Sequence, residues 1–105
     1  MKFNYNGQEI ELKYTMRSML KWENKYKRTF NPITLGETVY FFYCVLTSSK
    51  RDMSFDYEKF EDILDDNPQL FGEFAKWIAN VQVQNNMFNN ADEKEVKKED
   101  IDEKN

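Results

Sequence analysis

Residues 2–14, KFNYNGQEIELKY, carry the strongest fold signal in the chain, which is that of a β-hairpin. At its centre, Asn6-Gly7 favours a tight two-residue turn, because both central positions of such a turn need a positive φ. This turn sets the register and aligns two pairs, Phe3 with Ile10 and Tyr5 with Gln8. One face of the hairpin then carries Phe3, Tyr5, Ile10, Leu12 and Tyr14. Two strands alone are only marginally stable, so this face must pack on other elements.

Four helices are predicted to follow the hairpin, over residues 16–28, 35–48, 55–65 and 68–86. Their start signals are, in chain order, Thr15, Thr34 with Glu37 in the spacing of a capping box, Ser54 or Asp56, and Asn67 followed by Pro68. The second helix contains the run VYFFYCVL and is apolar on nearly all sides. A helix of that kind is typical of the centre of a domain.

The sequence therefore predicts an α+β fold that is mostly α, with an N-terminal β-hairpin followed by a compact bundle of helices. Residues 1–88 are expected to form a single globular domain. Residues 89–105 contain only Val96 and Ile101 as bulky apolar side chains. They cannot bury enough surface to offset the entropy lost on ordering, which predicts a disordered acidic tail.

Composition excludes several classes of catalytic and metal site. The 105 residues include no His and one cysteine, Cys44, so a zinc site, a Cys/His dyad or a Ser/His/Asp triad cannot form within the chain. Cys44 lies in the apolar run and is interpreted as a small buried hydrophobe. The acidic series from Asp52 to Asp66 lacks the glycine of an EF-hand loop. We expect no enzymatic activity, no cofactor and no metal.

Charge is distributed unevenly along the chain. Residues 1–51 carry +5, residues 52–91 carry −6 and residues 92–105 carry −3. Such polarity suits orientation-dependent association with another protein better than generic nucleic-acid binding. No apolar run approaches the roughly 20 residues that cross a bilayer, and no apolar signal sequence follows Met1. These features predict a cytoplasmic protein with no membrane partner.

In the first predicted helix, an acid lies within the apolar stripe. The stripe is predicted to run through Met16, Met19, Leu20, Trp22, Tyr26 and Phe30, and Glu23 falls inside it. A catalytic carboxylate needs a second acid, base or metal nearby, and the sequence suggests none. The alternatives are a contact with a partner or a structural role, with Glu23 partly buried and paired with Lys27, a tyrosine hydroxyl or backbone N–H groups. Trp22, Glu23 and Lys27 are accordingly treated as a structural motif.

The opposite side of this helix is basic, and its four residues are candidates for partner binding: Arg17, Lys21, Lys25 and Arg28. They can form a solvated face, contact an acidic protein or follow a nucleic-acid backbone. The last possibility defines an alternative function, that of a small nucleic-acid-associated regulatory protein. Because the domain as a whole is not basic, a protein partner is favoured.

Two stretches of sequence resemble the tail assembly chaperones of long-tailed bacteriophages. The first is the hairpin followed by MRSMLKWE, with Arg17 a few positions before the aromatic-acid pair Trp22-Glu23. The second is SFDYEKFEDILDDNPQL at residues 54–70. The resemblance spans residues 14–88, although many family members have a glycine soon after the Glu-bearing helix, where this chain has YKRTF.

The resemblance implies a non-enzymatic role in phage or prophage tail morphogenesis. Proteins of this family associate with the tape measure protein, and in some systems with the tail tube protein, in the host cytoplasm. They are absent from the finished virion. Self-association is compatible with this role, whereas nucleic-acid binding is not expected from it.

Overall fold

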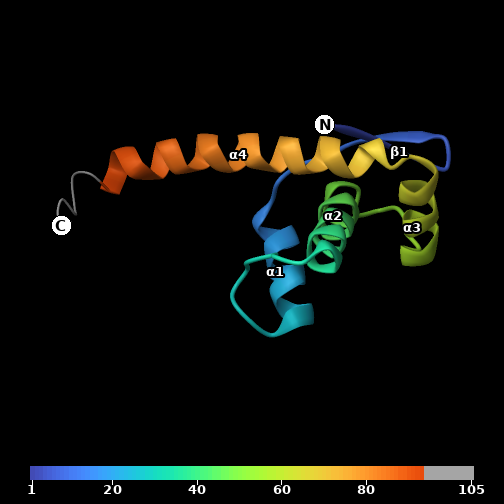
Figure 1. Ribbon diagram of the computed structural model, residues 1–105, viewed down its shortest axis with the longest axis horizontal. Coiled ribbons are helices and arrows are strands. Elements are labelled where there is room, and N and C mark those ends of the chain that lie inside the picture. The colour runs from blue at the N-terminus through green and yellow to red at the C-terminus, as the bar shows by residue number, and fades with distance from the viewer. Residues whose placement is uncertain (94–105) are drawn as a thin grey trace. The chain divides into compact units, whose positions relative to one another are not determined.

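The computed structural model describes the backbone of residues 1–93 and the side chains of residues 1–82. A two-stranded antiparallel hairpin comes first, with β1 at Lys2–Tyr5 and β2 at Gln8–Glu11. The helices that follow are α1 at Met16–Tyr26, α2 at Leu35–Ser49, α3 at Tyr57–Asp66 and α4 at Gln69–Glu93. This order, visible in Figure 1, confirms the predicted α+β class.

The hairpin has the predicted turn and the predicted register. Phe3 pairs with Ile10 and Tyr5 pairs with Gln8. Asn6 and Gly7 have φ values of 52° and 81°, the left-handed conformation that this tight turn requires. Leu12 is buried together with the apolar side chains of the two strands.

Three of the four predicted helix starts are confirmed, and the fourth is wrong in detail. The Thr15 and Asp56 side chains accept hydrogen bonds from the first turns of α1 and α3, and Thr34 forms a capping box with Glu37. The Asn67 side chain instead donates to the Ile63 carbonyl at 2.9 Å. Asn67 therefore closes α3 rather than capping α4, because the carbonyls at the end of α3 lack helical partners.

Helix boundaries differ from the prediction by more than one residue at three places. Helix α1 ends at Tyr26, because Lys27 adopts the left-handed conformation with φ 58°. Helix α3 begins at Tyr57, after its Asp56 cap. Helix α4 continues to Glu93, so residues 89–93, expected to belong to the tail, are helical. No glycine or proline interrupts this stretch to stop the helix, and residues 94–105 of the predicted tail lie outside the described part of the chain.

Helix α2 lies at the centre of the core, as its apolar sequence predicts, with α1 and α3 on either side of it (Figure 1). The Phe42 ring is fully buried and stacks on Phe74 with their centroids 4.1 Å apart. Phe3 from the hairpin and Phe60 from α3 meet the same ring edge-on, at 5.4 and 5.1 Å. One aromatic cluster thereby joins the hairpin, α2, α3 and the start of α4.

The chain divides into two compact units at Ala75. The first, residues 1–75, contains the hairpin, α1, α2, α3 and the first turns of α4. The described part of the second unit continues α4 to Glu93. Within the described residues, no helix combines the length and apolar character that crossing a membrane requires.

Candidate functional site

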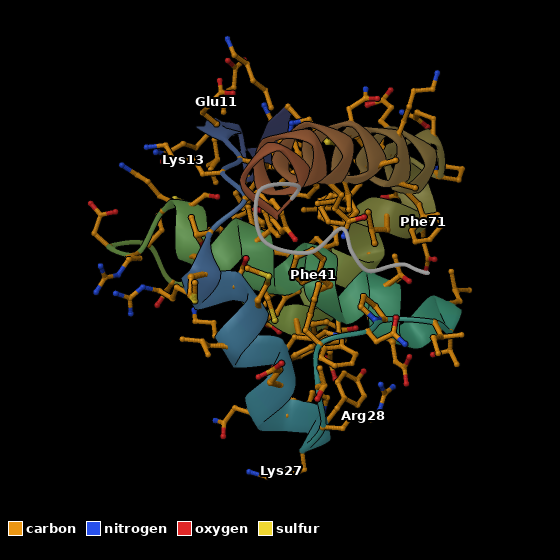
Figure 2. All side chains as sticks on the ribbon, turned by 90° about the vertical axis from the view of Figure 1, so that its left-hand side faces the viewer. Glu11, Lys13, Lys27, Arg28, Phe41 and Phe71 are labelled. Carbon is orange, nitrogen blue, oxygen red and sulfur yellow. The ribbon has the colours of Figure 1, made fainter. Side chains whose placement is uncertain are left out.

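Glu23 holds the end of α1 together through both its backbone and its side chain. Its carbonyl accepts the Lys27 N–H at 2.7 Å, and its carboxylate Oε2 accepts the Phe30 N–H at 2.6 Å. Of the three kinds of partner expected for Glu23, the structure shows the backbone N–H. The Lys27 ammonium lies 3.4 Å from the Asn24 side-chain oxygen instead. It is drawn at the outer end of α1 in Figure 2. Glu23 therefore orders the connection between α1 and α2.

The connection between α1 and α2 also contacts Trp22, whose side chain is fully buried. The indole N–H donates to the Glu37 carbonyl at 3.0 Å, and the Phe30 ring lies 5.3 Å from the indole. The Arg28 guanidinium lies over the indole at 4.8 Å, a cation–π arrangement, and pairs with the Glu37 carboxylate. Trp22 and Glu23 thus both contact the segment that follows α1, through Glu37 and Phe30 respectively.

Glu37 is the most strongly perturbed carboxylate of this assembly. Its oxygens accept the N–H groups of Ile33 and Thr34 as well as the Arg28 guanidinium. The Ile33 backbone N–H, followed by Arg28 and Thr34, lowers the pKa of Glu37 from its ordinary 4.5 to about 2. The carboxylate is a structural anion that connects the capping box of α2 to the end of α1.

The predicted apolar stripe of α1 is wrong at two positions. Met16 is 67% exposed and Leu20 is 56% exposed. The residues that α1 buries are Ser18 and Trp22, one turn apart, on the side that faces α2. The Ser18 hydroxyl donates to the Thr15 carbonyl at 2.6 Å, which satisfies the hydroxyl within the helix. Ser18 and Trp22 therefore form the buried side of α1, and Met16 and Leu20 lie outside it.

The predicted basic face does not form a free stripe. Lys21 donates to the Thr47 hydroxyl at 3.1 Å, and the Lys25 ammonium lies 5.0 Å from the centre of the Tyr40 ring. Arg28 forms an ion pair with Glu37 and a cation–π contact with Trp22. Among the residues with described side chains, Arg17 alone of these four makes no such contact.

Lys21 and Lys25 stand at a cleft of about 400 Å³ between α1 and α2, whose other lining residues are Asn24, Tyr40, Tyr43, Cys44 and Thr47. Burial raises the pKa of the Cys44 thiol to about 12, so the thiol is protonated at neutral pH. This agrees with its interpretation as a small buried hydrophobe. The hydroxyls of Tyr40 and Tyr43 also have raised pKa values, chiefly because of burial. No nucleophile is activated in this cleft.

A second hollow, of about 570 Å³, lies where α2 begins, beside α3 and the start of α4. We call it the acid-rimmed groove, and its lining residues are Leu35, Val39, Glu61, Asp62, Leu64, Asp65, Pro68 and Phe71. Apolar side chains from three helices form one part of its lining, and three carboxylates from α3 form the other. Leu35 is 68% exposed, and neighbouring Ile33 is 72% exposed. Figure 2 shows Phe71 near the start of α4.

Sequence reasoning missed this groove. It considers the acidic residues of α3 only as a possible EF-hand loop and rejects that role for lack of a glycine. The available signals were local: an exposed apolar residue, Leu35, directly after the Thr34 cap, and acids on both sides of Leu64 in the sequence. What brings them together is the packing of α3 against the first turns of α2, which no local pattern reveals.

Chemically, the groove can hold apolar side chains and attract positive charge. Within the described part of the chain, no three His, Cys, Asp or Glu side chains gather in a way that could hold a metal ion. Comparisons of the chain with protein-family models, curated proteins and solved structures give no match, so its function is inferred from its own residues.

Proposed function

We propose that this chain is a non-enzymatic tail assembly chaperone of a long-tailed bacteriophage or prophage. In this role it acts in the cytoplasm of the bacterial host. It binds the tape measure protein, and the tail tube protein where that is a partner, during tail morphogenesis, and it leaves before the virion is complete. The observation that carries the proposal is the acid-rimmed groove, whose apolar side chains are open to a partner. Open apolar surface with a polar border is typical of protein-binding sites.

The second stretch that resembles the family coincides with this groove. Residues 54–70 supply five of the eight residues that line it. The first stretch lies elsewhere in the fold, where Trp22 and Glu23 form hydrogen bonds that hold the connection between α1 and α2. The second resembling stretch therefore forms most of the lining of the proposed binding surface, and the first stretch supports the fold.

The alternative function, nucleic-acid binding by the basic face of α1, receives less support. Lys21, Lys25 and Arg28 already contact Thr47, Tyr40 and Glu37 respectively. A phosphate backbone would have to compete with each of these contacts. Binding of duplex DNA at micromolar affinity in about 150 mM salt, with a steep salt dependence, would favour this alternative.

The test of the chaperone proposal is co-expression with the tape measure and tail tube proteins of the same genome. The full chain should co-purify with the tape measure protein and increase its soluble yield. Leu35→Glu should abolish both effects, because it places a charge in the groove. It should leave the fold intact, because Leu35 is exposed and an acid in the first turn of a helix is favourable.

Leu20→Glu is the matched control, since Leu20 is an exposed leucine outside the groove. It should leave co-purification unchanged. If neither tail protein is retained by the wild-type chain, the chaperone proposal is wrong.

A further inference from the structure

We propose that the acid-rimmed groove binds a basic amphipathic helix of the partner protein and selects it by charge. This inference rests on the proposed function only in taking the groove as the docking surface. The partner helix would place apolar side chains into the groove and direct lysine or arginine side chains to the carboxylates of α3. Helix-in-groove binding uses apolar anchors three and four residues apart in this way.

The apolar side of the groove has the spacing that such a helix needs. Leu35 and Val39 are one turn apart on α2 and therefore project from the same side of that helix. Leu64 from α3 and Phe71 from α4 complete the apolar lining. A volume of about 570 Å³ falls within the range of roughly 300–1,000 Å³ that is usual for binding pockets. The groove has room for the side chains of a helical ridge.

The rim gives the groove its charge selectivity. Glu61 and Asp65 are four residues apart on α3, so they lie on the same side of that helix. Asp62 adds a third carboxylate to the lining. Among residues 1–82, whose side chains are described, none of the three makes an ion pair. Their charge is available to attract a cationic partner and to repel an anionic one.

A second copy of this chain is the main competing occupant. Its helix α1 exposes Met16 and Leu20 beside the basic residue Arg17. That surface offers only one pair of apolar residues one turn apart, on a helix of 11 residues that ends at Tyr26. The groove presents apolar side chains from three helices, which a longer amphipathic helix fills more completely.

The experiment measures binding of a labelled synthetic helix to the full chain by fluorescence anisotropy. The probe is a peptide of about 15 residues, long enough for appreciable helix, with leucines three and four residues apart on one face and lysines elsewhere. One comparison peptide replaces every lysine by glutamate. Another keeps the composition but distributes the leucines around the helix. Only the basic amphipathic peptide should bind, with a dissociation constant in the micromolar range and a loss of affinity as salt is raised.

Two matched triple variants separate the groove from general attraction between opposite charges. Glu61→Gln, Asp62→Asn and Asp65→Asn together should weaken binding of the basic peptide by about tenfold or more. Glu58→Gln, Asp66→Asn and Glu73→Gln together remove the same charge from exposed residues outside the groove, and should change the affinity by less than about twofold. Equal effects of the two triple variants, or equal binding of the glutamate peptide, would overturn the proposal.

Sedimentation velocity of the full chain tests whether a second copy of this chain occupies the groove. The wild-type chain and the groove triple variant should sediment alike. If the wild-type chain self-associates and the groove triple variant does not, a second copy fills the groove and the inference is wrong.

If the tape measure protein co-purifies but the basic peptide does not bind, the inference fails while the chaperone proposal stands. Groove-dependent peptide binding without retention of either tail protein is the opposite outcome, which sustains the inference and removes the chaperone proposal.

Discussion

The Glu23 carboxylate accepts the backbone N–H of Phe30 at 2.6 Å, although the two residues lie on opposite sides of the left-handed residue that ends α1. The chain thereby returns toward α1, and the Phe30 ring lies 4.7 Å from the ring of Phe41. Without the bond to Glu23, the part-buried Phe30 N–H would lose this acceptor, and an unsatisfied group of this kind costs about 1–3 kcal/mol.

Glu23→Ala should therefore lower the free energy of unfolding by about 1–3 kcal/mol. In a domain of this size that corresponds to a fall in melting temperature of several degrees, measurable by circular dichroism. Glu23→Gln keeps an acceptor oxygen and should cost less. An unchanged melting curve for Glu23→Ala would reduce Glu23 to a surface residue with no part in the connection.

Stability should depend on the protonation of Glu37 in acid. The folded pKa is about 2, below the ordinary value of 4.5, so the unfolded state takes up the proton more readily. The stabilisation is fully present above about pH 4.5 and is lost as pH falls through about 2. The difference in melting temperature between the wild type and Glu37→Gln should be largest at neutral pH and shrink across that window. A difference that is constant from neutral pH to about pH 2 would contradict the structural role of the carboxylate.

Phe42 and Leu35 lie on the same helix, and truncation should destabilise the protein strongly at Phe42 and hardly at all at Leu35. Phe42→Ala removes the ring that joins four elements of the core, and should cost about 3–5 kcal/mol of the roughly 5–15 kcal/mol that stabilise such a domain. Leu35→Ala truncates an exposed side chain and should change stability by less than about 0.5 kcal/mol. Urea titrations followed by tryptophan fluorescence measure both. A large loss on Leu35→Ala would mean that Leu35 belongs to the core rather than to a binding surface.

The Cys44 thiol should be unreactive in the folded protein. It is buried, and its pKa of about 12 leaves almost no thiolate at neutral pH. Ellman's reagent should therefore modify it at least about a hundredfold faster in urea than in native buffer, because reaction requires local opening. Ser54→Cys in a Cys44→Ala background provides the exposed control and should react quickly in both conditions. Fast modification of native Cys44 would show that the cleft beside it opens freely.

The features predicted correctly from the sequence are those set by neighbouring residues. The Asn6-Gly7 turn determines the hairpin register, and Thr15 and Thr34 mark where two helices begin. The orientation of α1 could not be predicted in this way. Leu20 and Trp22 are two residues apart and lie about 160° from each other on the helical wheel. One face of α1 cannot bury both, and only the tertiary packing decides that Trp22 is buried and Leu20 exposed.

In the candidate site, too, features set by neighbouring residues were predictable and features set by tertiary packing were not. Glu23 was expected to be partly buried and paired, and its bond to Phe30 lies within one connection. The basic residues of α1 are candidates for partner binding by sequence, with a solvated face as an alternative. In the structure Lys21, Lys25 and Arg28 contact the protein itself, because α2 supplies a hydroxyl, a ring and a carboxylate beside them. The groove joins Leu35, Glu61 and Phe71 from three helices, so it exists only in the folded chain.

Site-specific photo-crosslinking tests the central claim, that the acid-rimmed groove is the docking surface for a tail protein. A photoreactive phenylalanine analogue would replace Leu35 in the groove or Leu20 on α1, two exposed leucines of the same full chain, during co-expression with the tape measure protein of the same genome. Illumination should give a covalent adduct with the tape measure protein from position 35 and none from position 20. An adduct from position 20 alone, or a stable complex with no adduct from position 35, would contradict the account.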